Sequence, residues 1–125
     1  MLIDDNADDN FFHERVIRKS SYADMILVKQ SALDALNYLK KDLLESEYPD
    51  LIFLDINMPA MNGWEFLEEF NQLTKVSQRN PIIIMLTTSD NPDDKENANT
   101  YKIVSDFKTK PLTKDMLDSI IQKFF

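Results

Sequence analysis

Five short segments that favour β-strands alternate along the chain with five segments that favour α-helices. The expected strands are residues 1–3, 25–28, 51–54, 82–86 and 105–109, and helical patterns follow at about residues 7–19, 31–44, 62–70, 91–101 and 113–124. Strands joined by helices pair in parallel, because a parallel pair needs a long crossover connection. The alternation therefore predicts an α/β fold, a three-layer doubly wound (βα)5 chain with a five-stranded parallel sheet.

The buried faces of the first two helices are predicted from their large apolar residues. In the first helix these are Phe11, Phe12, Val16 and Ile17, and in the second Leu33, Leu36, Leu39, Leu43 and Leu44. The polar residues 74–80 are predicted to form a loop. The single histidine, His13, has no second histidine with which to share a metal and is interpreted as a surface or boundary residue.

Length and composition narrow the class of protein. The 125 residues suit one domain over residues 1–125, and the net charge of −8 would repel nucleic acid. No apolar run approaches the roughly 20 residues of a membrane span, so no membrane partner is expected. The chain has no cysteine, which fits a reducing cytoplasm, and a cytoplasmic location is expected.

Polar side chains stand at the ends of four of the five expected strands. Asp4 and Asp5 follow the first strand, Asp55 the third, Thr87 the fourth and Lys110 the fifth. Because the carboxyl ends of parallel strands lie along one edge of a sheet, these side chains should collect there. Taken singly, each has an ordinary alternative, such as helix capping for Asp4 and Asp5. Together they favour a functional site.

The predicted site combines carboxylates with one ammonium group. Carboxylates a few ångströms apart repel by roughly 4 kcal/mol per pair near a protein surface, and Lys110 offsets only one of them. Mg²⁺, which takes oxygen ligands, would offset more, with Asp5 and Asp55 as direct ligands and Asp4 holding a bound water. A metal ion, a lysine and a hydroxyl beside an aspartate suit phosphoryl transfer to that aspartate.

Four motifs in order resemble those of the receiver domain of two-component response regulators, in the single-domain style of the chemotaxis regulator. They are Leu-Ile-Asp-Asp, Leu-Asp-Ile-Asn-Met-Pro-Ala-Met-Asn-Gly, Leu-Thr-Thr-Ser and Lys-Thr-Lys-Pro. The resemblance covers essentially the whole chain. It implies the flavodoxin-like strand order 2-1-3-4-5. It also implies a cis bond between Lys110 and Pro111.

The resemblance also implies a role for each site residue. Asp55 would accept a phosphoryl group from a histidine of a partner histidine kinase or phosphotransfer protein, and Thr87 and Lys110 would contact that group. Mg²⁺ would be held by Asp5, by Asp55 and by the backbone carbonyl of Asn57, with Asp4 acting through water. The protein would be a switch that catalyses its own phosphorylation and dephosphorylation rather than a turnover enzyme.

In the family, a switch couples the Thr to an aromatic residue of the fifth strand, and Phe107 occupies that position here. Movement of Thr87 toward the phosphoryl group would turn Phe107 inward and change the surface of the last two helices and the fifth strand, where a downstream protein target would bind. Phe107 could equally be an ordinary core residue. Asn57 and Ser89 stand at positions that tune dephosphorylation in the family, and neither supplies an acid or a base.

Three other functions stay open on the residues alone. A phosphatase with an aspartate nucleophile usually carries a second Asp where this chain has Asn57, and it needs a substrate cap. A nucleotide or flavin binder needs a glycine-rich turn, and the chain has one Gly. A pseudo-receiver scaffold would bind partners without phosphorylation, although the set of acidic, hydroxyl and lysine residues is intact.

Overall fold

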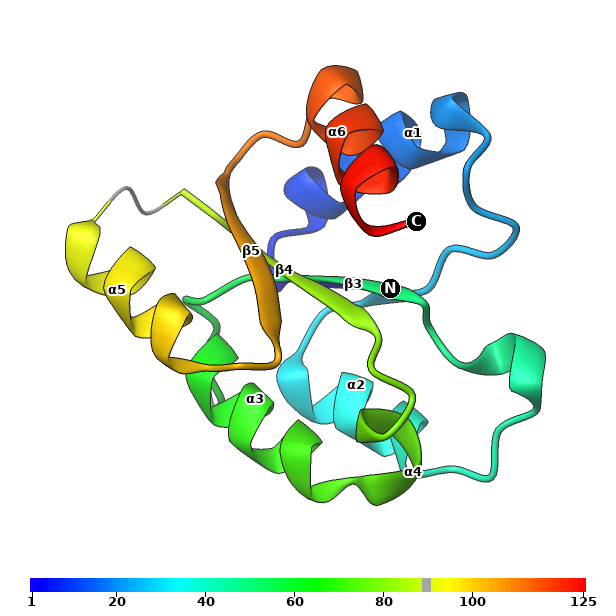
Figure 1. Cartoon of the computed structure of the whole chain (residues 1–125), viewed down its shortest axis with the longest axis vertical. Helices are drawn as coiled ribbons and strands as arrows, with labels where there is room; N and C mark the ends of the chain where they lie inside the picture. The colour runs from blue at the N-terminus through cyan, green and yellow to red at the C-terminus, as the bar shows by residue number, and fades with distance from the viewer. Residues whose placement is uncertain (89–90) are drawn as a thin grey trace.

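The chain forms a five-stranded parallel sheet in the order β2-β1-β3-β4-β5 in the computed structural model, which describes residues 1–88 and 91–125 (Figure 1). The strands are β1 Leu2–Ile3, β2 Val28–Lys29, β3 Leu51–Leu54, β4 Ile82–Thr87 and β5 Val104–Thr109. The α/β prediction and the strand order implied by the resemblance are both confirmed.

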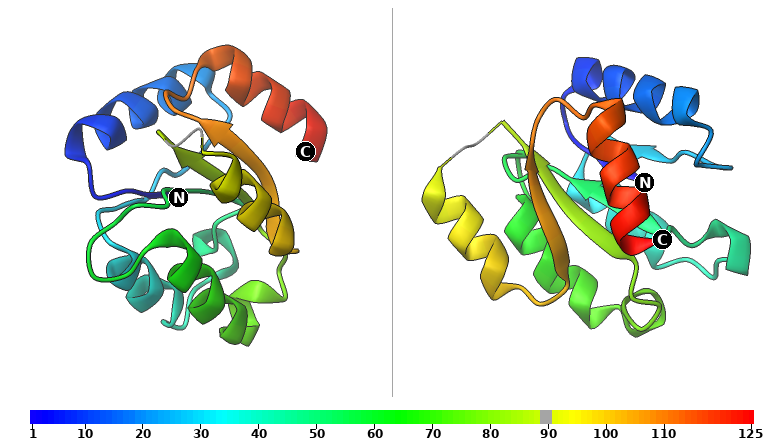
Figure 2. Two further views of the ribbon diagram at one scale, coloured as in Figure 1. Left: turned by 90° about the vertical axis from the view of Figure 1, so that its left-hand side faces the viewer. Right: turned by 45° about the horizontal axis from the view of Figure 1, so that its top comes forward.

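Helices cover both faces of the sheet (Figure 2). The helices α1 Ala7–Ser20 and α6 Lys114–Phe124 lie on one face. The other face carries α2 Ala32–Leu39, α3 Gly63–Gln72, α4 Thr74–Ser77 and α5 Pro92–Thr100, and a short 3-10 helix, Glu45–Glu47, precedes β3. None of the helices in the described residues is both long and apolar enough to cross a membrane.

The sheet is buried between two apolar clusters because alternate residues of a strand point to opposite faces. In β3, Ile52 and Leu54 belong to the cluster under α2 and α3, whereas Phe53 belongs to the cluster under α1 and α6. In β4, Ile83 and Met85 face the first cluster and Ile84 and Leu86 face the second. Burial on both faces explains the continuous apolar runs of these strands.

Several helix starts form as their sequences indicate. Ser31 accepts a hydrogen bond from the Asp34 amide at 3.0 Å, and Thr113 accepts one from the Met116 amide at 3.2 Å. Asn62 and Glu65 form a reciprocal capping box at the start of α3.

The buried face of α1 differs from the prediction. Phe11 and Phe12 are each 60% exposed, whereas Asn10, His13 and Ile17 are buried. Residues 10, 13 and 17 are spaced by three and four, so they form one stripe of the helix. The prediction is confirmed for Ile17 but wrong for Phe11 and Phe12, because two members of the buried stripe are polar. His13, interpreted above as a surface or boundary residue, is 3% exposed.

The second helix is shorter than predicted, and only part of its predicted apolar face is buried. It ends at Leu39, and Leu33 and Leu44 are 55% and 68% exposed. Leu36 and Leu39 are buried as predicted, and Ala32 and Ala35 are buried beside them. Residues 74–77 were predicted to be loop but form α4, which buries Val76. The strand predicted at residues 25–28 is reduced to Val28–Lys29, the two residues that pair with β1.

Candidate functional site

Backbone hydrogen bonds continue past the strands and hold the predicted site residues at one edge of the sheet. The amide of Asp4 donates to the Lys29 carbonyl at 3.1 Å, and the amide of Asp55 donates to the Ile3 carbonyl at 3.0 Å. The amide of Lys110 donates to the Thr87 carbonyl at 2.7 Å. The peptide bond between Lys110 and Pro111 is cis, as the resemblance implied.

Three carboxylates meet at this edge. Asp4, Asp5 and Asp55 each offer an oxygen atom, and these atoms lie within 4.8 Å of one another. Asp4 and Asp55 are 5% and 7% exposed, while Asp5 faces solvent. An all-oxygen donor set with an open side fits a hard divalent cation that keeps some of its waters, such as Mg²⁺. The residues present therefore fit the predicted metal.

Lys110 is the buried counter-charge of this cluster, with a side chain that is 8% exposed. Its Nζ lies 2.5 Å from Asp4 Oδ2 and 2.9 Å from Asp9 Oδ2, and 3.7 Å from Asp55 Oδ1. Burial disfavours the charged amine, but the hydrogen bonds to Asp4 and Asp9 outweigh burial and the pKa of Lys110 is raised. Lys110 therefore remains an ammonium ion throughout the physiological pH range.

The Asp55 carboxyl is a weak acid for an aspartate. Burial and the nearby charge of Asp4 raise its pKa to about 6, although Lys110 acts in the opposite direction. Oδ1 of Asp55 accepts a hydrogen bond from the Ile56 amide at 2.9 Å, and the Thr87 side chain also hydrogen-bonds the carboxylate. A bound cation would favour the ionised form, because it adds an opposite charge.

The remaining predicted residues surround this centre in different ways. Thr87 is fully buried at the end of β4. Asn57 is exposed in the loop that follows β3, and its carbonyl remains a predicted ligand. Phe107 is half-buried on β5 and packs against the cluster under α2 and α3. Ser89, which was expected to tune dephosphorylation, lies outside the described residues.

Gly63 is required by a close approach of two backbone segments. Its amide donates to the Ile56 carbonyl at 2.8 Å, at the point where α3 begins beside the loop after Asp55. A Cβ atom at position 63 would lie 2.5 Å from the Asp55 carbonyl oxygen, which is too close for any side chain. The single glycine of the chain thus lets α3 pack directly against the backbone of the site.

Two residues of the site were missed from the sequence. Asp9 was interpreted only as an acidic residue of the first helical turn, yet it contacts Lys110 across 101 positions of sequence. Asn10 was not singled out, yet its Nδ2 donates to the Asp4 carbonyl at 2.8 Å. Acidic residues also favour helix starts, so nothing local distinguished Asp9 from Asp8.

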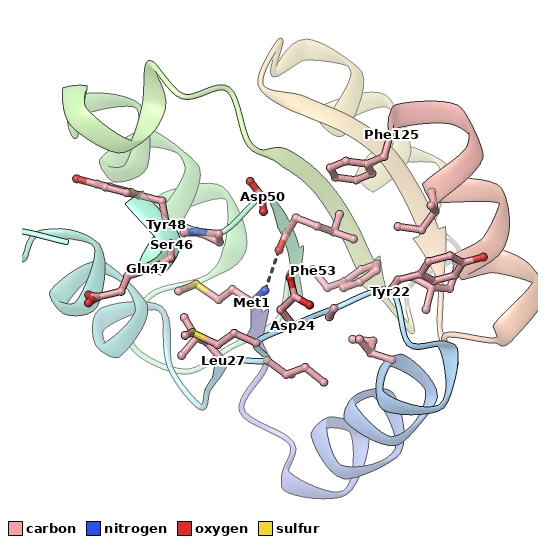
Figure 3. Close-up of a pocket in the computed structure, with 18 residues that line it drawn as sticks. Met1, Tyr22, Asp24, Leu27, Ser46, Glu47, Tyr48, Asp50, Phe53 and Phe125 are labelled. Carbon is pink, nitrogen blue, oxygen red and sulfur yellow. Dashed lines mark hydrogen bonds between the residues drawn. The ribbon is translucent and has the colours of Figure 1, made fainter. Parts of the chain in front are cut away.

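A cavity of about 540 Å³ lies at the opposite edge of the sheet, near the amino ends of β1 and β3 (Figure 3). It is bordered by Met1, Tyr22, Asp50 and Phe125, and the Met1 amino group donates to the Leu51 carbonyl at 2.7 Å. This cavity is separate from the acidic edge, because the two sit at opposite ends of the same strands.

A parallel sheet of this order with acidic residues, a threonine and a lysine at its carboxyl edge defines a receiver-type fold. The family model of the response regulator receiver domain matches residues 1–122. The chain belongs to this family, whose members generally act as signalling switches of two-component systems. Phosphorylation on Asp and Mg²⁺ binding in the acidic pocket are features of the family.

Individual relatives agree with this assignment. Response regulator Rcp1 of Synechocystis sp. is 31% identical over 96 residues, which is 75% of this chain and 64% of Rcp1. A protein-glutamate methylesterase/protein-glutamine glutaminase of Burkholderia thailandensis is 32% identical over 88 residues, 70% of this chain and 22% of that protein. The match therefore spans less than two-thirds of each of these curated relatives.

A solved structure of a two-component response regulator from Cytophaga hutchinsonii is similar throughout. It is 32% identical, with a TM-score of 0.88, and the alignment covers 98% of this chain and 92% of that one.

Proposed function

We propose that this chain is a phosphorylation switch in which Asp55 accepts a phosphoryl group from a phosphohistidine of a histidine kinase or phosphotransfer protein. The observation that carries this proposal is the placement of Asp55. Its carboxylate is buried, lies 3.7 Å from the Lys110 ammonium group and shares a 4.8 Å cluster with Asp4 and Asp5. Asp55 attacks phosphorus, the bond from phosphorus to the donor nitrogen breaks, and the imidazole leaves with the electron pair.

The acidic residues would hold Mg²⁺ for this reaction. Asp5 and Asp55 would be direct ligands together with the Asn57 carbonyl, and Asp4 would act through a bound water. When bound, the ion supplies positive charge that offsets the carboxylates and the oxygens of the incoming phosphoryl group. The solvent-facing position of Asp5 leaves this side of the site accessible to the phosphodonor.

Lys110 and Thr87 would bind the oxygens of the phosphoryl group after transfer. The Lys110 ammonium group contacts Asp4 and Asp9 and lies 3.7 Å from Asp55, so it would need only a short movement to reach the new oxygens. Thr87 already hydrogen-bonds the Asp55 carboxylate and would turn its hydroxyl to a phosphoryl oxygen. Catalysis would consist of positioning and charge stabilisation rather than proton transfer.

Phosphorylation would reach a protein target through Thr87 and Phe107. Both residues lie in paired strands, with Thr87 opposite Thr109 and Met85 opposite Phe107 in the β4–β5 register. Phe107 is half-buried, so a small displacement of Thr87 would let it turn further into the core. The surface formed by α5, β5 and α6 would then change, and a downstream target would recognise that change.

The direct test is incubation with Mg²⁺ and a small phosphodonor, followed by intact mass measurement. We expect a species heavier by about 80 Da, one phosphoryl group, in the wild type. It should be absent in Asp55→Asn and present in Asp50→Asn, a control at the other end of β3. A phosphorylated Asp55→Asn protein would reject Asp55 as the acceptor. Multiple turnover of a simple phosphate ester would favour a phosphatase instead, and an unmodified wild type a pseudo-receiver.

A further inference from the structure

Asn10 is a buried polar residue on the inner face of α1, with 4% of its surface exposed. Its Nδ2 donates to the Asp4 carbonyl at 2.8 Å, so it ties the helix to the backbone where the acidic site begins. Within residues 1–88 and 91–125, its Oδ1 is the one buried side-chain nitrogen or oxygen without a hydrogen-bond partner in the protein. Native proteins rarely leave such an atom unpaired, and an ordered water is the usual partner.

A small cavity lies beside this amide. Its polar lining consists of Asp4, Asn10, His13 and Asp55, and the rest of the lining comes from apolar residues of β1, β3 and β4. Its volume of about 10 Å³ is close to that needed for one water molecule. A buried water also needs two to four polar partners, and four of the lining residues carry polar side chains.

We infer that one water molecule sits in this cavity, donates one hydrogen bond to Asn10 Oδ1 and the other to the Asp4 carboxylate, and makes Asn10 a positioning residue of the acidic site. The two ends of the amide then act on different groups. Nδ2 holds the main chain of Asp4, and Oδ1 holds a carboxylate side chain through the water. Both contacts come from the α1 side, away from the solvent-facing Asp5.

The positioning role has a consequence for metal binding, and this part rests on the proposed function. Groups that orient metal ligands typically change metal affinity about tenfold to a hundredfold when they are removed. Asn10→Leu, which has a similar volume but no amide, should therefore weaken Mg²⁺ binding by about tenfold. Because Asn10 touches neither metal nor phosphoryl group, the phosphorylation rate at saturating Mg²⁺ should stay near that of the wild type.

Two measurements test the inference. The first is a crystal structure of the metal-free wild type at a resolution that shows ordered waters, with Asn10→Leu in the same crystal form. The second is Mg²⁺ titration by calorimetry, combined with phosphorylation rates over a range of Mg²⁺ concentrations. Asn37→Leu, an exposed position on α2, is the matched control. Asn10→Ser, a smaller change, replaces Asn10→Leu if the latter does not fold.

The expected result is a water in the wild-type cavity, none in Asn10→Leu, and a Mg²⁺ affinity reduced only in the Asn10 variants. A wild-type cavity without a water would overturn the inference. An unchanged affinity, or a maximal rate reduced at every Mg²⁺ concentration, would reject the positioning role. A wild type that binds no Mg²⁺ would instead refute the proposed function, and the crystal structure alone would then decide whether the water is present.

Discussion

The ammonium group of Lys110 lies 2.9 Å from the carboxylate of Asp9, in the first turn of α1. Lys110 follows β5, so this contact joins the last strand to the first helix. Together with Asp4 at 2.5 Å, Asp9 holds the ammonium group nearer to these two acids than to Asp55, at 3.7 Å. Lys110 thus interacts with three carboxylates, and its contacts with Asp4 and Asp9 should affect the pKa of Asp55.

Asp9→Asn should lower the pKa of Asp55 below its wild-type value of about 6. Without the Asp9 charge, Lys110 can move toward Asp55, and an opposite charge at shorter range favours the carboxylate. The stability cost should be below about 1 kcal/mol, because Asp9 is partly exposed. Carboxyl titration by NMR measures the pKa in metal-free buffer. Asp8→Asn, an exposed neighbour, is the control, and an equal pKa in both variants would contradict the prediction.

Asp55 should make the metal-free protein less stable as the pH rises. Its folded-state pKa of about 6 exceeds the ordinary value of 3.8, so the native state binds the proton more tightly than the unfolded state. The free energy of unfolding should therefore fall between about pH 4 and pH 6. Asp55→Asn lacks this term and should be more stable by about 1–2 kcal/mol near pH 7.5. Urea denaturation with a chelator present measures both proteins.

Adding Mg²⁺ in the urea denaturation should make the wild type more stable than Asp55→Asn. The ion stabilises only a native state that binds it, so the wild type should gain stability with rising Mg²⁺ concentration while Asp55→Asn gains less. An advantage of Asp55→Asn that is equally large at about pH 4 would show that ionisation of Asp55 is not its cause.

Lys110→Gln should destabilise the metal-free protein by about 2–4 kcal/mol, because it leaves buried carboxylates without their counter-charge. Mg²⁺ should restore part of this loss, and its affinity should rise, since the cation would no longer compete with an ammonium group. Thermal unfolding with chelator and with Mg²⁺ measures both effects. Lys108→Gln is the control, because Lys108 is a third exposed and pairs loosely with Asp106 at 3.4 Å. Equal losses in the two variants would argue against a special role for Lys110.

Gly63→Ala should cost about 1–3 kcal/mol, because its Cβ would lie 2.5 Å from the Asp55 carbonyl oxygen and push α3 away from the site. Phosphorylation by a small phosphodonor should slow as well, since the backbone of Asp55 must shift. Ala60→Gly is a contrasting control in the same loop. Ala60 has a φ of 67°, so glycine there should stabilise by about 0.5–1 kcal/mol. Urea denaturation compares the two, and no loss in Gly63→Ala would contradict the close approach.

Phe11 and Phe12 should contribute to docking of the protein phosphodonor. The centroids of the two rings lie 5.8 Å apart in an edge-to-face arrangement. Both residues are 60% exposed and lie on α1, the helix that follows the acidic loop. Aromatic side chains, Phe among them, are enriched in protein–protein interfaces. Phe11→Ser with Phe12→Ser should slow phosphotransfer from a kinase about tenfold or more, a loss of at least about 1.4 kcal/mol. The reaction with a small phosphodonor should be unchanged, and Leu44→Ser is the surface control. Equal slowing of both reactions would indicate damage to the site rather than lost docking.

The sequence by itself determined the class of fold and the edge at which the site forms. The continuous apolar runs of residues 51–54 and 82–86 required burial on both faces, and parallel strands place all their carboxyl ends together. Asp4, Asp55 and Lys110 could therefore be assigned to one edge without knowledge of distances. The helical patterns predicted from residues 62 and 113 likewise begin at Asn62 and Thr113, which cap their helices, because capping depends on residues three apart.

Tertiary structure alone decided which polar residues turn inward. Asn10 and His13 occupy the stripe of α1 that faces the sheet, while Phe11 and Phe12 face solvent, and no local pattern encodes that rotation. The pairing of Lys110 with Asp9 likewise depends on two segments 101 residues apart that meet only when the sheet is assembled. Periodicity and capping are local properties of a chain, whereas burial and charge pairing depend on which distant segments become neighbours.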